Sequence, residues 1–329
     1  MKKQKLILGI LFAAAIIPPV SSKPQSSIDS AITLFNQAHY AEARNLLRAE
    51  IYRTPNNPAL YYWLGKCDFE LFDNDAAITN AERAVQLQPN NSQYHYFLGT
   101  TYGHKAESAN PFTGLSLARK AEHEFTRAVE LDPHDMDAQR DLISYCIDAP
   151  GFAGGGLDRA EDRIAKLDQI DPLQAHLARL ELYANRKKWG EAIQEANSVI
   201  AAKPKDAPPY LEVVEYYKDR EQAAEMRGAL AAIPRAINAD PHVDYYRGVA
   251  DILAEDRPDE AETFIKTYLS NWPPPRREDH APLAEAHFWL GRLAEQRGRR
   301  QDAIAEYRMA IKLDSHNKSA HDALRRMGM

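Results

Sequence analysis

A pattern of small and large residues in residues 285–317 constrains the fold more than any other feature of the chain. This stretch contains two short amphipathic segments that are hinged at Gly298. The residues that share one face of each segment are Leu290, Gly291, Ala294, Ala303, Tyr307 and Ala310. Small residues three, four and seven apart allow two antiparallel helices to approach closely, and the larger side chains fill the gaps. Because such a helix pair cannot bury its own apolar face, the pattern predicts further copies in the chain.

Copies of this pattern are present along most of the sequence. The small residue of the second segment recurs at Ala43, Ala77, Ala121, Ala160, Ala192, Ala223 or Ala224, Ala261 and Ala303. A proline follows in most units, at Pro55, Pro89, Pro133, Pro172, Pro204, Pro234 and Pro273. Proline cannot continue the hydrogen-bond ladder of a helix, so each is expected to end the second helix of its unit. With only 15 glycines and no long alternation of β-branched residues, the chain is predicted to be all-α.

The step of 34 residues from Pro55 to Pro89 resembles the period of the tetratricopeptide repeat family. Residues 58–91 carry the motif positions of that family at Leu64, Gly65, Ala77, Ala84 and Pro89. The resemblance covers about 24–317 and implies a right-handed α-solenoid of roughly seven to eight helix pairs. The expected repeats lie near 24–57, 58–91, 92–135, 136–173, 174–206, 207–240, 242–275 and 284–317.

Some parts of the chain depart from the regular repeat. The sixth unit, 207–240, is degenerate because it lacks the Leu-Gly pair, and the proline-rich run between Pro273 and Leu283 is expected to be an extended linker. Residues 318–329 are expected to form a capping helix, which the open end of a stack requires.

Units three and four are longer than the others, and both insertions fall at the turn between the first and second helix. In unit three the extra residues lie in 103–120, where Asn110 and Pro111 predict an N-cap and a first helical residue, with both helices lengthened. In unit four they lie in 149–162, where Asp158 and Glu161 predict a capping box. Equivalent turns of neighbouring repeats lie side by side, so the insertions are expected to form one lobe.

The first 22 residues are predicted to be a secretory signal peptide. Three lysines precede an apolar run over 6–17, and a site of small residues ends at Ser22. An apolar run of that length rises only about 18 Å as a helix, which is short for a membrane core of roughly 30 Å. An uncleaved N-terminal anchor is the alternative, and the segment has no cysteine for lipid attachment. The protein is therefore expected to be periplasmic or secreted, without a membrane span after cleavage.

The charge and the cysteines restrict the function further. Cleavage would remove three of the 41 basic residues and none of the 47 acidic ones, so the formal net charge would fall from −6 to −9. An acidic chain lacks the clustered Lys and Arg on which nucleic-acid binding depends, so we expect no nucleic-acid partner. Cys67 and Cys146 fall two repeats apart, on the order of 20 Å, beyond the reach of a disulfide. Both are predicted to be buried free thiols.

We find no sequence pattern that indicates catalysis or cofactor binding. His123 and Glu124 begin like a zinc-protease helix, but Arg127 stands where the second histidine is needed. The glycines at 154–156 are followed by Leu157 and Asp158 rather than by the Lys and Ser or Thr of a phosphate-binding loop. The segment at 114–118 lacks the preceding strand of a nucleophile elbow. We therefore predict no enzyme, no catalytic residue, no metal site and no cofactor.

A partner-binding groove follows from the family resemblance, because first helices of tetratricopeptide repeats line a concave surface. The positions that face this surface in the family are occupied here by Tyr62, Trp63, Lys66, Phe69, Tyr96, Phe97, Thr100, Arg140 and Ser144. Near the C-terminus they are occupied by Tyr246, Arg247, Phe288, Trp289 and Arg292. Aromatic and cationic side chains are suited to anchor a peptide or helix, although single rings could instead pack against the next repeat. The family's clamp for a C-terminal carboxylate is missing, because its positions hold Ile28, Ile32, Trp63, Gln93 and Phe97.

These observations predict a non-enzymatic protein-interaction scaffold of the bacterial cell envelope. A protein or peptide partner, whose identity the sequence does not reveal, would bind in the concave groove. The alternative is a structural or assembly factor that contacts its partners through the inserted lobe, at 104–114 and 149–157. An enzyme or glycan-binding protein would require a pocket between lobe and groove.

Overall fold

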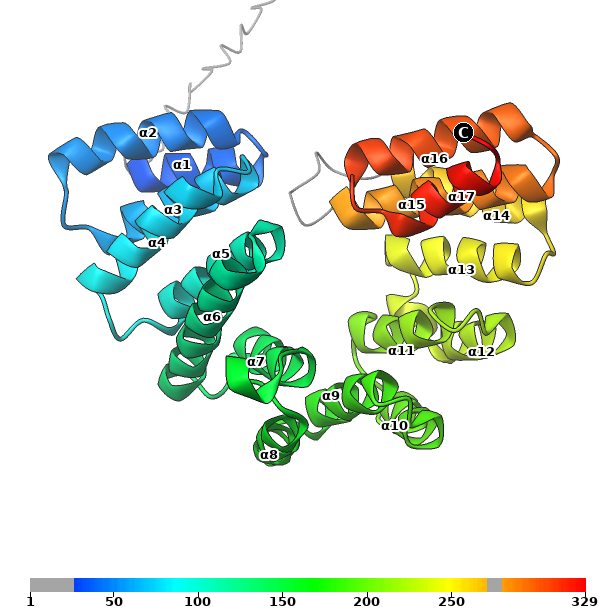
Figure 1. Ribbon diagram of the computed structural model, residues 1–329, viewed down its shortest axis with the longest axis horizontal. Coiled ribbons are helices and arrows are strands. Elements are labelled where there is room, and N and C mark those ends of the chain that lie inside the picture. Colours follow the sequence, from blue (N-terminus) through cyan, green and yellow to red (C-terminus); the bar gives the residue numbers. More distant parts are fainter. Residues whose placement is uncertain (1–26, 271–279) are drawn as a thin grey trace, which may run out of the picture.

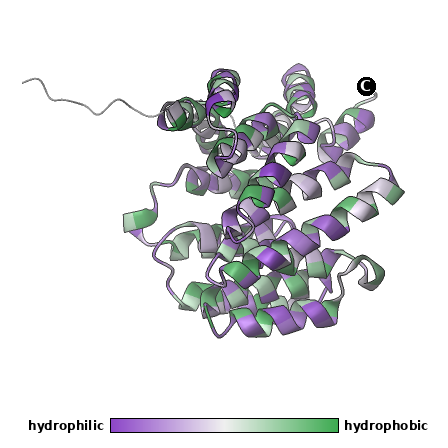
Figure 2. Ribbon diagram, turned by 90° about the vertical axis from the view of Figure 1, so that its left-hand side faces the viewer, coloured by the Kyte–Doolittle hydropathy of each residue, from purple (hydrophilic) through white to green (hydrophobic). Residues whose placement is uncertain are grey.

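The computed structural model describes residues 27–270 and 280–329, and over these residues it is built of helices without strands. The predicted signal peptide and most of the predicted linker lie outside the described residues. Helix α15 begins at His280, so residues 280–282, which were expected in the linker, belong to a helix instead. Hydrophilic and hydrophobic residues are mixed along the helices, as expected for amphipathic helices that each bury one face (Figure 2).

The described chain forms consecutive antiparallel helix pairs followed by one further helix. The α-helices are α1 (Ser27–Asn36), α2 (Tyr40–Arg53), α3 (Pro58–Glu70), α4 (Asn74–Leu87), α5 (Ser92–Ser108), α6 (Pro111–Leu131), α7 (Met136–Asp148), α8 (Leu157–Leu167), α9 (Pro172–Asn185), α10 (Trp189–Ala201), α11 (Pro208–Lys218), α12 (Ala223–Ala232), α13 (Pro241–Leu253), α14 (Pro258–Ser270), α15 (His280–Gln296), α16 (Arg300–Leu313) and α17 (Lys318–Arg326). Two 3₁₀ turns, η1 (Gly151–Ala153) and η2 (Arg235–Ile237), lie between them. The α-solenoid fold is therefore confirmed.

The pairs are stacked in an arc with α1–α4 at one end and α15–α17 at the other (Figure 1). Each odd-numbered helix from α1 to α15, which we call a first helix, packs against the second helix of its own pair. First helices also contact one another, as in α7 with α9, α11 with α13 and α13 with α15. Side chains of α7 reach α11, and those of α11 reach α15, across the first helix between them. Such contacts require the inside of a bend, so the first helices form the inner face of the arc.

Close contact within each pair depends on glycine in the first helix. A Cβ atom added to Gly291 on α15 would lie 2.5 Å from the ring of Tyr307 on α16. One added to Gly99 on α5 would lie 2.7 Å from the ring of Phe125 on α6. The turn between α15 and α16 passes through Gly298 at a φ of +70°, a conformation that glycine adopts without strain. The helix hairpin predicted for residues 285–317 is confirmed in these details.

A recurring hydrogen bond joins each of several units to the unit before it. In each case a side chain near the start of the next helix, which is α3, α5, α7 or α17, binds the backbone carbonyl six residues earlier. Tyr61 Oη donates to the Pro55 carbonyl at 3.0 Å, and Gln139 Nε2 donates to that of Pro133 at 3.0 Å. His95 Nε2 lies 2.9 Å from the Pro89 carbonyl, and His321 Nε2 lies 3.1 Å from that of Ser315. A carbonyl can only accept, so these histidine nitrogens are the protonated ones.

The expectation that each proline ends a second helix holds at some positions and is wrong at Pro172. Pro55 and Pro89 follow the ends of α2 and α4. Pro172 instead begins α9, and Asp171 before it accepts hydrogen bonds from the amides of Leu173 and Gln174. Proline suits the first position of a helix because the amide hydrogen it lacks would have no partner there.

The two insertions are accommodated differently but meet in one lobe. In unit three the helices lengthen, to 17 residues in α5 and 21 in α6, and Asn110 caps α6 as predicted. In unit four the extra residues form η1 and a loop that ends at Gly156. The predicted capping box at Asp158 is wrong, because Gly156 occupies the N-cap and no side chain caps α8. Arg119 of α6 donates to the carbonyl of Phe152, which joins the two insertions.

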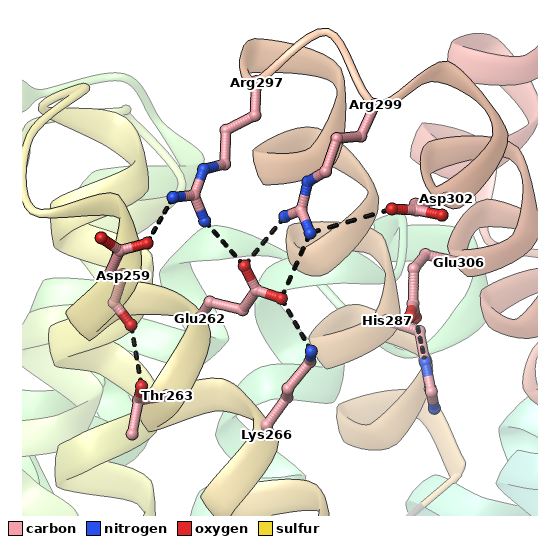
Figure 3. A network of polar contacts seen from close by, with 9 residues as sticks. All are labelled: Asp259, Glu262, Thr263, Lys266, His287, Arg297, Arg299, Asp302 and Glu306. Atoms are coloured by element: carbon pink, nitrogen blue, oxygen red, sulfur yellow. Dashed lines mark hydrogen bonds and ion pairs between the residues drawn. The ribbon is translucent and has the colours of Figure 1, made fainter.

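A charged network joins α14 to the turn between α15 and α16 (Figure 3). The Glu262 carboxylate accepts hydrogen bonds from Arg297 and Arg299 at 2.8 Å each and from Lys266 at 2.7 Å. The hydrogen bonds from Lys266 and Arg299 lower the pKa of Glu262 to about 2. The last two helix pairs are thereby connected by charge as well as by apolar packing.

The two cysteines are free and buried, as predicted. Burial raises the pKa of Cys67 to about 12 and also raises the pKa of Cys146. Neither thiol is therefore suited to act as a nucleophile at neutral pH.

Candidate protein-binding surface

The predicted groove residues lie on the first helices α3, α5 and α7. Tyr62, Trp63, Lys66 and Phe69 belong to α3, Tyr96, Phe97 and Thr100 to α5, and Arg140 and Ser144 to α7. These helices follow one another along the inner face, but the side chains differ in how far they remain accessible.

Phe69 and Phe97 are core residues, which corrects their assignment as partner anchors. Their side chains are 8% and 7% exposed and belong to the apolar cluster between the second and third pairs. The Phe97 ring lies 5.5 Å from that of Tyr62 and 6.2 Å from that of Phe69. Gly65 leaves the space that Phe97 fills, since a Cβ there would lie 3.0 Å from this ring. These two rings therefore stabilise the stack.

Tyr62, Trp63 and Lys66 remain partly exposed and form a cluster with the buried ring of Phe35. The Lys66 ammonium lies 5.2 Å from the centre of the Trp63 ring, 5.3 Å from that of Phe35 and 5.7 Å from that of Tyr62. Cations at such distances are attracted to the faces of aromatic rings. Edge-to-face contacts of 5.4 Å and 5.5 Å join Trp63 to Phe35 and to Tyr62. Burial raises the pKa of Tyr62 to about 12, so its hydroxyl stays neutral.

Tyr96 and Thr100 continue the inner face on α5. Burial first, and then the charge of Asp141, raise the pKa of Tyr96, whose hydroxyl is hydrogen-bonded to Asp141. Burial likewise raises the pKa of Asp141. Thr100 donates to the carbonyl of Tyr96 within its own helix at 3.1 Å. The Tyr96 ring is held 5.9 Å from that of Phe125, so its position is fixed although it remains partly exposed.

Arg140 is engaged in a network within the protein. Its guanidinium lies 2.9 Å from Glu212 on α11, 3.7 Å from Glu181 on α9 and 3.3 Å from the side-chain oxygen of Gln174. Ser144 is hydrogen-bonded to Glu181, whose pKa is raised by burial. Arg140 and Ser144 therefore hold three first helices together.

The predicted residues of the C-terminal units are also largely engaged. Tyr246 and Trp289 are buried in the core, and Arg247 is bound to Asp244 and Asn238. Arg292 lies 2.6 Å from Glu221 and stands over the ring of Trp289, and Phe288 packs partly buried on Tyr307.

A group of carboxylates on or next to the first helices α7, α9, α11 and α15 was not predicted from the sequence. Besides Asp141 and Glu181 it comprises Asp137, Glu212, Glu215, Asp219 and Glu285. Its central cation is Lys218, which is buried and lies 2.9 Å from Glu285 and 3.2 Å from Glu215. Burial lowers the pKa of Lys218, but the charges of Glu285 and Glu215 outweigh it and raise the pKa to about 12. The spacing of Glu212, Glu215 and Asp219, three and four residues apart in the sixth unit, is the signal in the sequence that points to this group.

The described residues show no feature of a metal centre or a membrane span. Within residues 27–270 and 280–329, no three His, Cys, Asp or Glu side chains are grouped so that they could hold a metal ion. Within the same ranges no helix combines the length and the apolar character that crossing a membrane requires.

The fold and this surface define a repeat protein of the helical-hairpin solenoid class. Family models described as tetratricopeptide repeat match residues 28–92 and 284–317. These two stretches match tetratricopeptide repeats, and the fold supports a protein of that family. Repeats of this family generally mediate protein–protein interactions and typically form scaffolds without enzymatic activity.

Solved structures of similar fold share little sequence with this chain. A tetratricopeptide repeat protein from Parabacteroides merdae is 17% identical, with a TM-score of 0.52 over 79% of this chain and 96% of that one. A thermophilic repeat protein from Thermus thermophilus is 18% identical, with a TM-score of 0.45 over 58% of this chain and 96% of that one. The human IFIT1 dimer with m7Gppp-AAAA is 14% identical, with a TM-score of 0.44 over 87% of this chain and 71% of that one. The first likeness shows the fold alone. The sequence matches no curated protein.

Proposed function

We propose that this protein is a non-enzymatic scaffold of the bacterial cell envelope that binds a segment of a partner protein along its inner face. The observation that carries the proposal is the state of Tyr62, Trp63 and Tyr96. Each ring remains partly exposed, while contacts with neighbouring rings hold it in place. Aromatic side chains that are already ordered lose little conformational entropy on binding, which makes them efficient anchors.

The rest of the inner face suggests the charge of the bound segment. Beyond the rings the segment would meet the carboxylates of α7, α9 and α11, of which Asp141 and Glu181 have pKa values raised by burial. We expect the segment to place an apolar residue near Trp63 and basic residues further along. The same carboxylates would repel the phosphates of a nucleic acid, so we expect no nucleic-acid partner.

The binding site can be tested by photo-cross-linking. A benzoylphenylalanine at position 100 should give a discrete adduct with one envelope protein, and Trp63→Ala should abolish it. Tyr52→Ala is a matched control, because Tyr52 is an aromatic residue that is 90% exposed on α2, and it should leave the adduct unchanged. An adduct that survives Trp63→Ala would contradict the site.

We propose that the protein is exported, because its N-terminal sequence has a charged start, a short apolar run and a site of small residues. Fractionation of cells that express the full chain should place it outside the cytoplasm, with Lys23 as the first residue. A protein that stays in the cytoplasm with residues 1–22 intact would refute this part of the proposal. An exported chain that retains them would instead support the anchor.

A further inference from the structure

Three phenylalanines are exposed at the same place in three successive repeats. Phe72, Phe112 and Phe152 follow the first helices of units two, three and four, with exposures of 55%, 90% and 71%. Phenylalanine is among the residues most often buried in folded proteins. Phe72 also has a φ of +61°, a left-handed conformation that is costly for a bulky residue. The left-handed conformation itself belongs to the turn, because Ala38, Lys187 and Glu221 adopt it after the first helices of other units. The exposure of a phenyl ring at three successive turns is the feature particular to units two to four.

The backbone at Phe152 is held firmly, so the exposure of this ring belongs to the folded structure. Arg119 Nη2 donates to the Phe152 carbonyl at 2.5 Å, Tyr145 Oη donates to that of Ala153 at 2.5 Å, and Arg159 donates to that of Gly154. The Gly156 amide donates to the Cys146 carbonyl at 2.8 Å. Side chains from three helices thus fix consecutive carbonyls and leave the phenyl ring facing outward.

Phe112 is held equally well by the first turn of α6. Asn110 accepts a hydrogen bond from the amide of Thr113 at 3.1 Å, and Pro111 is the first helical residue. The backbone of this turn packs on the end of α5, since a Cβ on Gly114 would lie 3.1 Å from the Ala106 carbonyl.

A hollow of about 490 Å³ lies beside Phe112, and Arg119, which lines it, also reaches the Phe152 loop. Its lining combines the apolar groups of Phe112, Tyr102 and Leu115 with the basic side chains of Arg119, Lys120 and His123. Lys120 stands 5.0 Å over the ring of Tyr102. Glu124, which also lines the hollow, lies 2.5 Å from His95 and is thus engaged within the protein. Arg119 is shared, because it lines the hollow and also holds the Phe152 carbonyl.

The geometry points to a second docking surface, formed by Phe112, Phe152 and this hollow, for a protein segment that carries an apolar side chain flanked by carboxylates. Phe112 and the other apolar residues of the hollow would bury the apolar side chain, and Phe152 would contact the segment further along. Arg119 and Lys120 would attract the carboxylates. An anionic membrane is the less favoured occupant, because a hollow of this size suits one inserted side chain better than a flat layer of headgroups. This surface is separate from the inner face proposed above, so both could be occupied together.

The experiment selects ligands from a library of random twelve-residue peptides displayed on phage, against the purified protein. Peptides recovered on wild type but not on Phe112→Ser/Phe152→Ser should combine Leu, Ile or Phe with neighbouring Asp or Glu. Their affinity should fall at least tenfold in the double variant and severalfold in Lys120→Glu. It should not change in Tyr52→Ala, which removes an equally exposed ring elsewhere, or in Trp63→Ala, which removes an inner-face anchor.

Several outcomes would overturn the assignment. The assignment is wrong if the recovered peptides are basic, or if they bind the double variant as tightly as wild type. It is also wrong if no recovered peptide is sensitive to the double substitution. Binding to phosphatidylglycerol vesicles that depends on both rings would favour a membrane and reject the protein segment. Because both rings are exposed, thermal unfolding of the double variant should match that of wild type, which separates loss of binding from loss of fold. Loss of peptide binding in Trp63→Ala would show that the inner face had been probed instead.

Discussion

Gly291 shows at the scale of one residue how this fold depends on the absence of a side chain. It lies on α15 opposite Tyr307, which is fully buried and whose hydroxyl donates to Glu295 at 2.8 Å. With one edge of the ring against Gly291 and its hydroxyl engaged, Tyr307 has little freedom to move. The packing of this helix pair therefore tolerates only glycine at position 291 without a shift of the Tyr307 ring.

We predict that Gly291→Ala lowers the free energy of unfolding by about 1–3 kcal/mol, because the new methyl group would overlap the Tyr307 ring. Gly103→Ala is the matched control, since it makes the same change within α5 where the added Cβ has no neighbour within 4 Å outside the local helix backbone. That variant should be more stable than wild type by about 0.5–1 kcal/mol, because alanine loses less backbone entropy in a helix. Urea unfolding of both variants measures the difference, and equal effects would contradict the close contact.

The residue scale also shows why the sequence placed some side chains wrongly. Phe97 and Tyr96 are adjacent on α5 and both fall at positions that face the groove in the family. Phe97 turns into the space above Gly65, whereas Tyr96 stays at the inner face. Which of the two is covered depends on the distance between α3 and α5, and that distance depends on side chains 30 residues apart. Helical periodicity within one unit does not contain this information.

At the scale of elements, the recurring hydrogen bond to the preceding carbonyl joins successive units with interchangeable donors. Tyr61, His95, Gln139 and His321 differ in size and chemistry, yet each reaches the carbonyl six residues earlier. The spacing is visible in the sequence only after the structure has shown it, because no single residue type marks it. The bond satisfies a carbonyl just beyond the end of a helix, where no helical partner is available.

Gln139→Ala should lower the stability by about 1–3 kcal/mol, because the buried Gln139 would leave the Pro133 carbonyl without its partner. Gln139→His should recover most of the loss, since His95 makes the equivalent bond with Nε2 two helices earlier. The midpoints of thermal unfolding compare the three proteins. A histidine variant as unstable as the alanine variant would show that the bond is not the cause.

Glu262 gives the junction of α14 with the α15–α16 turn a defined pH dependence. The pKa of Glu262 in the folded protein is about 2, below its ordinary value of 4.5, because Lys266 and Arg299 donate to the ionised carboxylate. A lowered pKa means that the stabilisation is fully present above pH 4.5 and is lost as the pH falls towards 2. Glu262→Gln should therefore cost about 1 kcal/mol at neutral pH, and the difference from wild type should shrink below pH 4.5.

Urea unfolding of wild type and Glu262→Gln at a series of pH values tests this expectation. Glu260→Gln serves as the control, because Glu260 is exposed on the same helix. Its ion pair with Arg257 is long, at 3.9 Å, and therefore weak. A Glu262 effect that is constant with pH would argue against the charged network.

Element boundaries were harder to predict than the elements themselves. The repeated helix pairs follow from small residues at fixed spacing, a signal that lies within each unit. Pro172 and Asp158 were misplaced because proline and aspartate suit more than one position near a helix start. At Gly156 the glycine loop, held by contacts with α6 and α7, decides where α8 begins.

At the scale of the molecule, ion pairs that reach across whole repeats join the inner face of the arc. Arg140 on α7 binds Glu212 on α11, and Lys218 on α11 binds Glu285 on α15. Each contact passes over one first helix and so favours a tightly bent arrangement.

No local pattern predicts such pairs, because their partners are 72 and 67 residues apart in the sequence.

Lys218 is the cation whose removal should most change the shape. Its ammonium is buried among Glu215, Asp219 and Glu285, at 3.2, 3.6 and 2.9 Å. In Lys218→Met the carboxylates of α11 would face that of α15 without a counter-charge, and their repulsion should open the arc. Small-angle X-ray scattering should show a larger radius of gyration in about 0.01 M salt and a return towards wild type in about 1 M salt, where charges are screened within about 3 Å. Lys312→Met removes an equal charge from the exposed surface of α16 and should leave the radius unchanged. If both variants expand equally, net charge rather than the α11–α15 contact sets the curvature.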